Sequence, residues 1–532
     1  MWTQIYDPLG NLTLSALAAM LPVFVVLFML GVLRKPAWIS AIAGFVASLV
    51  VALFIYGMPA SIAVSTILYG AAYGILPIGW IVFTALLLYR ITVETGKFEI
   101  IKSSLSGLTG DNRLQVLLIA FAFAAFIEGA AGFGTPVAIA AAMLVGLGFR
   151  PFFAAAICLL ANTSPVAFGS LGTPLIMLQG VTKLPMDALS ANVGRLCAPI
   201  SLILPAYLML VMGGWPTLRA VLPAAILTGV SFATTQFLVS SYLGPLLTDI
   251  LGSICAMLAL VLLLRFWTPK GSPAPIPHKH TNGEVFQAWT PYLLLVVFVL
   301  VWGFPTTKAI LDQTTIVFGW PGLHNLITRI PPVTTTPTPY GANYSLNLLS
   351  ASGTSCLFAV ICSAFVLRVS PGRVLSYAWD TLKQLVLPII TIMSVLALAF
   401  IMNYSGQTAT LGLVVASTGA VFPFFSTFLG WLGVFLTGSD TSANALFGSL
   451  QEVTATRLGF SPTLMAAVNS SGGVLGKMIS LQSIAVAAAA TGLPKSEEAT
   501  LMRFTLKHSV ALTVLMGLIA MFYAYVMPGW VR

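Results

Sequence analysis

Residues 117–136, which read LLIAFAFAAFIEGAAGFGTP, combine two signals that together decide the fold. The first part, residues 117–127, is entirely apolar, as a segment inside a lipid bilayer must be. Glu128 follows at once, and the next eight residues include three glycines and a proline, which interrupt a helix. Broken backbone at membrane depth is tolerated only where it is buried in protein or lines a cavity. The stretch therefore predicts a membrane protein with a broken helix at an internal site.

The composition of the whole chain supports the same class. Of its 532 residues, 58% are hydrophobic and 7% are charged, and the mean hydropathy is +0.98, values that no soluble domain shows. Apolar runs long enough to cross a bilayer recur from residues 14–33 to residues 504–525. We expect an all-α integral membrane protein of roughly 12 to 14 transmembrane helices, forming a single polytopic domain over residues 1–532.

The charged residues, cysteines and histidines argue against nucleic-acid binding, disulfide bonds and metal binding. The net charge is +10, but Lys and Arg are scattered through short loops, which argues against nucleic acid and fits the positive-inside bias of a protein embedded in a lipid bilayer. The five cysteines lie within apolar runs without CxxC spacing, and the four histidines have dissimilar surroundings. We therefore expect no disulfide framework, no metal site and no cofactor.

Two polar interruptions divide the chain. They cover residues 268–287 and 305–343, and a single apolar run over residues 288–301 separates them, so they are expected on opposite sides of the membrane. The first carries the denser positive charge. The bias of Lys and Arg toward the inside then predicts a cytoplasmic loop at 268–287 and an extracytoplasmic loop at 305–343.

An internal repeat becomes visible when the sequence is compared with itself at an offset of 309 to 311 residues. The motif FIEG at 126–129 matches FLTG at 435–438, and LGFRP at 147–151 matches LGFSP at 458–462. Several weaker matches follow the same order. We expect a first repeat over residues 77–200 and a second over residues 388–510.

The two repeats differ in charge. Residues 403–432 contain no Lys or Arg, whereas the matching part of the first repeat carries Arg90, Lys97, Lys102 and Arg113. This contrast predicts opposite orientations in the membrane. We therefore expect two inverted repeats that contain broken helices or re-entrant hairpins, as in many secondary transporters.

Polar clusters interrupt the apolar pattern at corresponding places in the two repeats. Half-helix N-termini at such breaks can face an anionic substrate, and the hydroxyls and amides there can hydrogen-bond a carboxylate or a hydroxyl. Glycine-lined packing contacts and helix capping are the alternative explanations. The candidate substrate-binding residues are Gly129, Gly132, Thr135, Asn162, Thr163, Ser164, Ser439, Thr441, Asn444, Asn469, Ser470 and Ser471.

Ionisable residues inside membrane spans are costly and are usually functional. Glu128, Asp440 and Lys477 lie in the interrupted segments and are the candidates for proton coupling. A structural ion pair between Lys477 and Asp440 is the alternative for those two residues. Glu128 has no cation near it in the sequence, so it is the better candidate for the proton carrier.

No pattern indicates an enzyme. The glycine-rich residues 129–134 lack the Lys-Ser or Lys-Thr of a phosphate-binding loop, and we find no metal, nucleophile or cofactor constellation. A secondary carrier is the favoured class. A channel for small organic acids and a sodium-coupled carboxylate carrier are the alternatives.

The same segments resemble the bacterial lactate permease family, and the similarity runs over nearly the whole chain. The matching stretches include EGAAGFGTPVAIAAAMLVGLGFRP (128–151), NTSPVAFG (162–169), NYSG (403–406), FPFFSTFLGWLGVFLTGSDTSANALFG (422–448), NSSGGVLGKMIS (469–480), QSIA (482–485) and RFTLKHS (503–509). The resemblance implies proton-coupled uptake of L-lactate, D-lactate and glycolate across the bacterial inner (plasma) membrane. Homo-oligomer formation is left open by the sequence.

The chain departs from the family pattern at a few polar positions. Leu196 stands where the family usually has Gln, Gly213 where it has Asp, and Leu246 where it has Glu; Leu481 replaces a Pro. The stretch that usually reads Gly-Pro-Glu-Leu-Pro-Asp is Gly244-Pro245-Leu246-Leu247-Thr248-Asp249 in this chain. These losses bear on the exact substrate, whereas the four polar clusters are intact.

Overall fold

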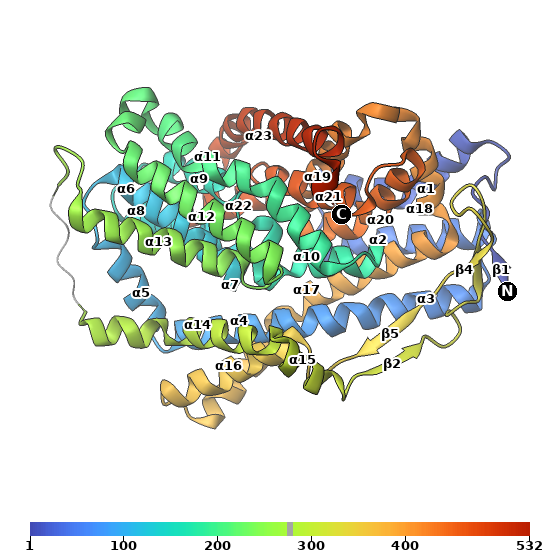
Figure 1. Cartoon of the computed structure of the whole chain (residues 1–532), viewed down its shortest axis with the longest axis horizontal. Coiled ribbons are helices and arrows are strands. Elements are labelled where there is room, and N and C mark those ends of the chain that lie inside the picture. Colours follow the sequence, from blue (N-terminus) through green and yellow to red (C-terminus); the bar gives the residue numbers. More distant parts are fainter. Residues whose placement is uncertain (133, 274–279, 532) are drawn as a thin grey trace.

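The computed structural model describes residues 1–132, 134–273 and 280–531 and is mostly helical (Figure 1). Within these residues, 12 helices are long and apolar enough to cross a membrane. The bent pair Pro151–Ala161 and Val166–Thr182 raises the number to 13 if it counts as one span. The prediction of an all-α membrane protein with roughly 12 to 14 spans is confirmed. His278 and Lys279 of the predicted loop at 268–287 lie outside the described residues.

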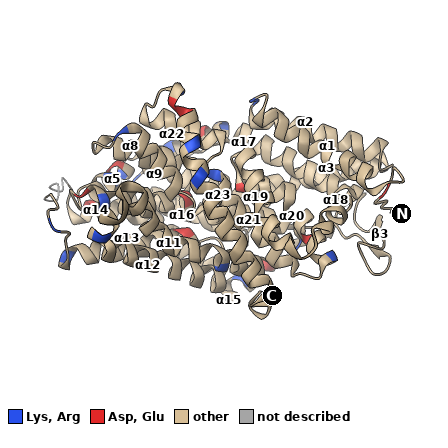
Figure 2. Ribbon diagram, turned by 90° about the horizontal axis from the view of Figure 1, so that it is seen from above, with Lys and Arg blue, Asp and Glu red and all other residues tan. Residues whose placement is uncertain are grey.

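Among the described residues, eight α-helices lie outside the repeated part of the chain. They are α1 (Leu12–Gly31), α2 (Ala37–Phe54), α3 (Ala60–Tyr73), α12 (Leu222–Tyr242), α13 (Thr248–Phe266), α14 (Asn282–Gly303), α15 (Pro305–Asp312) and α16 (Ser352–Val366). Exposed apolar side chains such as Leu17, Phe24 and Phe54 cover their outer faces. Figure 2 shows long stretches of helix without charged residues. Such faces are suited to contact with lipid tails.

The two halves contain helices in the same order. The first half has α4 (Trp80–Glu94), α5 (Lys97–Ser106), α6 (Asn112–Gln115) with η2 (Val116–Phe123) and α7 (Ala124–Ala130), α8 (Thr135–Gly146), α9 (Pro151–Ala161), α10 (Gly169–Thr182) and α11 (Met186–Ala220). The second has α17 (Pro371–Ser405), α18 (Gln407–Val415), α19 (Phe422–Thr437), α20 (Asp440–Leu458), α21 (Pro462–Lys477), α22 (Leu481–Thr491) and α23 (Lys495–Tyr525). Breaks between helices therefore recur at equivalent points.

Equivalent helices of the two halves lie at opposite ends of the molecule. α5 contacts the start of α14, where Lys97 Nζ donates to Gln287 Oε1 over 2.8 Å. The equivalent helix α18 follows Tyr404, whose hydroxyl donates to the Gly341 carbonyl over 2.9 Å. Figure 1 shows α5 and α18 at opposite ends of the long axis. An inverted repeat produces this arrangement.

Each half contains one hairpin of two helices, and the start and the end of each hairpin lie side by side. In the first half, Asn112 at the start of α6 and Arg150 after α8 line one hollow, so both ends of this hairpin lie together. In the second half, Tyr525 donates to the Ala420 carbonyl and its ring contacts Phe460, which joins the start of α19 to the end of α20. The tips of both hairpins therefore lie inside the molecule, as in re-entrant hairpins.

The segment at 305–343 contains strands, which the all-α expectation did not include. β2 (Ile316–Gly319) pairs antiparallel with β5 (Asn343–Leu346). β3 (Ile327–Arg329) lies between β1 (Trp2–Thr3) and β4 (Thr338–Pro339). Short strands satisfy backbone groups across chain segments, so the part of this segment that follows α15 is tied to the N-terminus through the pairing of β3 with β1.

Candidate functional site

The four breaks in the repeated helices meet around one cavity between the two halves. Its empty space is about 610 Å³, part of which is open to solvent. The lining residues come from the α7–α8 tip, the start of α10, the α19–α20 tip and the break between α21 and α22. They are Glu128, Gly132, Gly134, Val166, Gly169, Ser170, Thr173, Pro174, Gly438, Ser439, Asp440, Thr441, Lys477, Gln482, Ser483 and Val486.

Helix N-termini surround this cavity. The first turns of α10, α20 and α22 line it, as does the residue that precedes α8. The first N–H groups of a helix have no intrahelical partner, and the helix dipole adds a partial positive charge. N-termini that converge in this way favour an anionic ligand.

Left-handed backbone makes the tips possible. Gly132 and Gly134 have φ of 62° and 82°, and Gly438 has φ of 72°. A residue with a side chain is strained in this region, so these sharp turns require glycine. At the start of α10, Ser170 also has a positive φ, at 46°. Such strain persists where the surrounding structure enforces it, commonly at functional sites.

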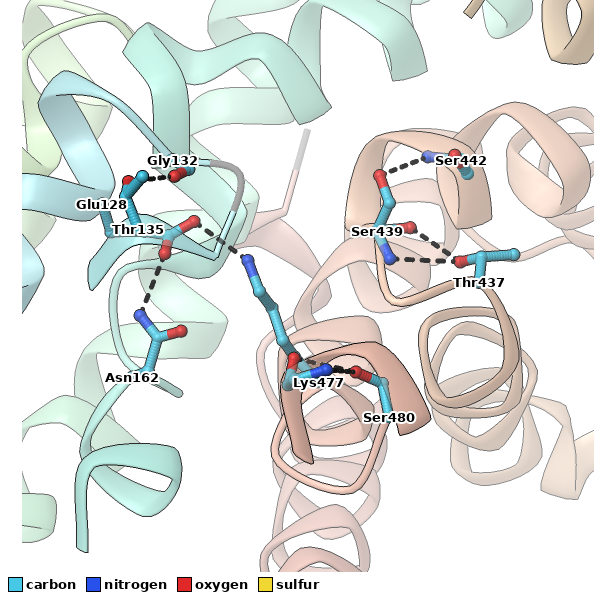
Figure 3. Close-up of polar contacts among 10 residues, drawn as sticks. Glu128, Gly132, Thr135, Asn162, Thr437, Ser439, Ser442, Lys477 and Ser480 are labelled. Atoms are coloured by element: carbon cyan, nitrogen blue, oxygen red, sulfur yellow. Dashed lines mark hydrogen bonds and ion pairs between the residues drawn. The ribbon is translucent and has the colours of Figure 1, made fainter. Parts of the chain in front are cut away.

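A buried ion pair links the two halves at the cavity. Lys477 Nζ, at the end of α21, lies 3.0 Å from Glu128 Oε1 on α7. Asn162 Nδ2 donates to Glu128 Oε2, also over 3.0 Å. Figure 3 shows Lys477 extending from the second half toward Glu128. The alternative interpretation, an ion pair between Lys477 and Asp440, differs from this structure, in which packing of the two halves brings Lys477 to Glu128, 349 positions away.

Asp440 is held by uncharged groups instead. Its Oδ2 accepts from Ser470 Oγ over 2.6 Å and from Asn444 Nδ2 over 3.3 Å. As the first residue of α20, it also lies at the positive end of a helix dipole. Asn469 Nδ2 donates to Asn444 Oδ1 and extends this network behind the cavity.

The predicted site residues differ in how close they lie to the cavity. Those that line the cavity are Glu128, Gly132, Ser439, Asp440, Thr441 and Lys477. Asn162 lies one hydrogen bond away, on Glu128. Asn444, Asn469 and Ser470 belong to the buried network around Asp440.

Several predicted ligand residues have structural contacts and do not line the cavity. Gly129 packs against α13, where an added Cβ would lie 2.8 Å from Asp249 Cβ. Thr135 donates to the Gly132 carbonyl, and Thr163 donates to the Leu160 carbonyl. Ser164 and Ser471 are buried and are not among the residues that line the cavity. Short polar side chains readily bond nearby backbone, so spacing alone does not separate ligands from caps.

The sequence interpretation missed the α10 and α22 segments. Ser170 and Thr173 belong to GSLGTP at 169–174, a Gly- and Pro-containing stretch directly after a named cluster, so composition could have indicated them. Gln482 and Ser483 follow the break after Lys477. Asp249 is buried next to Gly129 and was not named as a site residue.

Comparison with known proteins identifies the family. Residues 15–527 match the model of the L-lactate permease family. The chain is 46% identical to the L-lactate permease of Bacillus subtilis (strain 168), over 97% of both chains. It is 44% identical to the glycolate permease GlcA of Escherichia coli (strain K12), over 99% of both chains, and also 44% identical to the L-lactate permease of that strain.

A solved structure shares the fold at low sequence identity. The antimetabolite efflux pump MtrF of Neisseria gonorrhoeae aligns with a TM-score of 0.52 and 13% identity, covering 94% of this chain and 97% of the other. The curated relatives above are named as permeases. The chain therefore belongs to the L-lactate permease family and is a multi-pass membrane transport protein, not an enzyme.

Proposed function

We propose that the chain takes up lactate and related 2-hydroxy monocarboxylates such as glycolate across the bacterial inner membrane by proton symport. The observation that carries the proposal is the convergence of helix N-termini and the Lys477 ammonium on one internal cavity. A small carboxylate matches that charge. The names of the relatives, lactate and glycolate permease, supply the same class of anion.

The cavity offers a separate contact for each part of such a substrate. The carboxylate binds the backbone N–H groups at the starts of α20 and α10, together with Lys477. The 2-hydroxyl binds a side-chain hydroxyl of the lining, from Ser170, Thr173, Ser439 or Thr441. A monocarboxylate without a 2-hydroxyl would leave this second contact unmade and bind less tightly.

Competition for Lys477 couples the proton to the substrate. Ionised Glu128 holds Lys477 in the buried ion pair. A proton on Glu128 removes that negative charge and frees Lys477 for the substrate carboxylate. Binding of the proton and binding of the anion therefore favour each other, which is the linkage that symport needs. Asp440, in the same cavity lining, is the second coupling candidate.

The repeats supply the conformational change. The first repeat, over 77–200, and the second, over 388–510, each bring one hairpin tip and one broken helix to the cavity. Rocking of one half against the other would expose the site first to one side and then to the other. In this arrangement the loop at 268–287 is cytoplasmic and the segment at 305–343 is extracytoplasmic.

Transport by the purified full-length chain tests the proposal. Proteoliposomes containing the wild type should accumulate labelled lactate above the outside concentration when the outside is acidified, with or without sodium. Accumulation that needs sodium and ignores pH would identify a sodium-coupled carrier. Equilibration without accumulation under either gradient would identify a channel.

A further inference from the structure

A third carboxyl group, that of Asp249, is buried beside the ion pair. It lies in the first turn of α13 and is 1% exposed. Neither of its carboxyl oxygens has a hydrogen-bond partner in the described part of the protein. Glu128 and Asp440 both accept hydrogen bonds from neighbouring side chains. Of the three carboxyl groups, Asp249 is thus the one that receives no hydrogen bond in the described part of the protein.

Asp249 lies directly against the segment that carries Glu128. Gly129 follows Glu128 in the chain, and an added Cβ there would lie 2.8 Å from Asp249 Cβ. The ionisable groups that act on Asp249 are Glu128, Lys477 and the Cys197 thiol on α11. α12, η2 and α10 also pack against α13, and their sequences contain no Asp, Glu, Lys, Arg or His.

Charge balance then assigns a protonation state. Lys477 offers one positive charge, and Glu128 takes it at 3.0 Å. An ionised carboxylate without a partner in a buried site is far costlier than a neutral one. The position of Asp249 near a helix N-terminus favours negative charge only weakly by comparison. This balance of charges favours a protonated Asp249 while Glu128 is paired with Lys477.

We propose that Asp249 is a second proton-binding residue of the transport site and passes its proton to Glu128 when the substrate draws Lys477 away. This inference rests on the proposed proton symport. In the transfer, the O–H bond of Asp249 breaks and an O–H bond forms on Glu128. Asp249 then takes a replacement proton from the aqueous side to which the site is open. After the substrate leaves, Lys477 returns to Glu128 and the Glu128 proton is released.

The test compares Asp249→Asn with wild type in proteoliposomes. Asn keeps the shape and removes the titratable group. Uphill lactate accumulation under an acid-outside gradient should fall by about tenfold or more, because a positioned proton-transfer group contributes at least that much. The rise of accumulation as the outside pH falls should flatten. Lactate exchange between equal concentrations should persist, because exchange needs no net proton release. Asp249→Glu should restore part of the accumulation.

Ser253→Ala provides a matched control one turn along α13, because the Ser253 hydroxyl is buried and donates only within its own helix. It should leave accumulation and the pH profile unchanged. An Asp249→Asn carrier with the wild-type pH profile overturns the proposal. The proposal is also overturned if Asp249→Asn loses exchange and accumulation equally and Asp249→Glu restores neither. That result would indicate a structural role for Asp249. A wild type that ignores the pH gradient instead overturns the symport on which the proposal rests.

Discussion

Lys477 occupies a position where two anions compete for one positive charge. Its buried ammonium group is paired with Glu128, and the same group faces the cavity in which a substrate carboxylate would lie. A buried ion pair contributes little net stability, because desolvation offsets most of the attraction. Removing either partner is costly, because a buried charge is then left uncompensated. Lys477 is thus well suited to exchange the Glu128 carboxylate for the carboxylate of a substrate.

Glu128→Gln tests the proton side of this exchange. The variant keeps the side-chain volume and the contact with Asn162, but it cannot hold a proton or a negative charge. Uphill lactate accumulation should collapse. Exchange between equal concentrations should continue at a lower half-saturating lactate concentration, because Lys477 no longer has a competing carboxylate. Initial rates of labelled uptake and exchange, scaled to the amount of reconstituted protein, give both quantities. Accumulation at the wild-type rate would exclude Glu128 from coupling.

The pairing itself can be tested through the amount of folded protein. Lys477→Met leaves Glu128 buried without its cation and should cost about 3–5 kcal/mol of stability. Adding Glu128→Gln should restore much of that loss. Adding Asp440→Asn should not, because Asp440 is held by Ser470 and Asn444. Thermal unfolding of the detergent-solubilised variants, followed by size-exclusion chromatography, measures the difference. Rescue by Asp440→Asn alone would mean that the pairing seen here is not the one that stabilises the protein.

For single residues, the sequence could indicate which ones are candidates for the site but not which of them contact one another. The ionisable residues in the broken segments could be found because charge is rare in an apolar chain. Their pairing could not, because Lys477 reaches Glu128 only through the packing of one half on the other. Asp249 was hidden for a related reason. It follows a glycine- and proline-containing turn and starts a long apolar helix, where an acidic residue is also an ordinary helix-start residue.

Glycines in the second half serve two different purposes at the element scale. Gly438 forms the hairpin tip with its positive φ, whereas Gly472 lies inside the continuous helix α21. A Cβ on Gly472 would lie 2.2 Å from the Thr427 carbonyl oxygen of α19. The cluster at 469–473 therefore packs α21 closely against α19, and the break comes later, after Lys477. Small residues bring helices together in this way in membranes.

Gly472→Ala should separate α19 from α21 and lower stability by about 1–3 kcal/mol, the usual cost of overpacking. Gly146→Ala is the control, because a Cβ at Gly146 near the end of α8 would meet nothing within 4 Å. Alanine there should be neutral or stabilising by up to about 1 kcal/mol from helix propensity. The unfolding temperature of each purified variant reports the change. Equal effects of the two substitutions would contradict the close helix contact.

The positions of helix breaks could be predicted well where glycine or proline interrupts an otherwise apolar sequence. The tip after Glu128 and the tip at Gly438 both follow this rule. The small sheets at 316–346 could not be predicted in this way, because their strands are two to four residues long and pair with distant segments. The start of α10 is another such case, since nothing in Ser170 or Leu171 favours the left-handed backbone that packing imposes there.

The arrangement of the whole molecule follows from the orientation of its two halves. α23 begins near the hollow lined by Asn112 and Arg150, and it ends where Tyr525 contacts Ala420. A helix of 31 residues is about 46 Å long, which exceeds the thickness of a bilayer. The loop around Ala420 is therefore separated by a full span from Asn112, its counterpart in the first half. In an inverted arrangement, the same sequence pattern would form a wall of the cavity from each side of the membrane.

Labelling of single cysteines tests this orientation in cells. Glu99 on α5 is a suitable position because its side chain is 73% exposed, and Thr418 between α18 and α19 is also exposed. In a background without the five native cysteines, a membrane-impermeant maleimide added to intact cells should label Thr418→Cys. It should label Glu99→Cys only after the membrane is permeabilised, because Arg90, Lys97 and Lys102 around Glu99 favour the cytoplasmic side. Val317→Cys, in the exposed strand β2, marks the expected extracytoplasmic side. Retained lactate uptake by each variant shows that the fold is intact.

If Glu99→Cys and Thr418→Cys react from the same side, the two halves are not inverted. The alternating exposure of the cavity would then need a different mechanism.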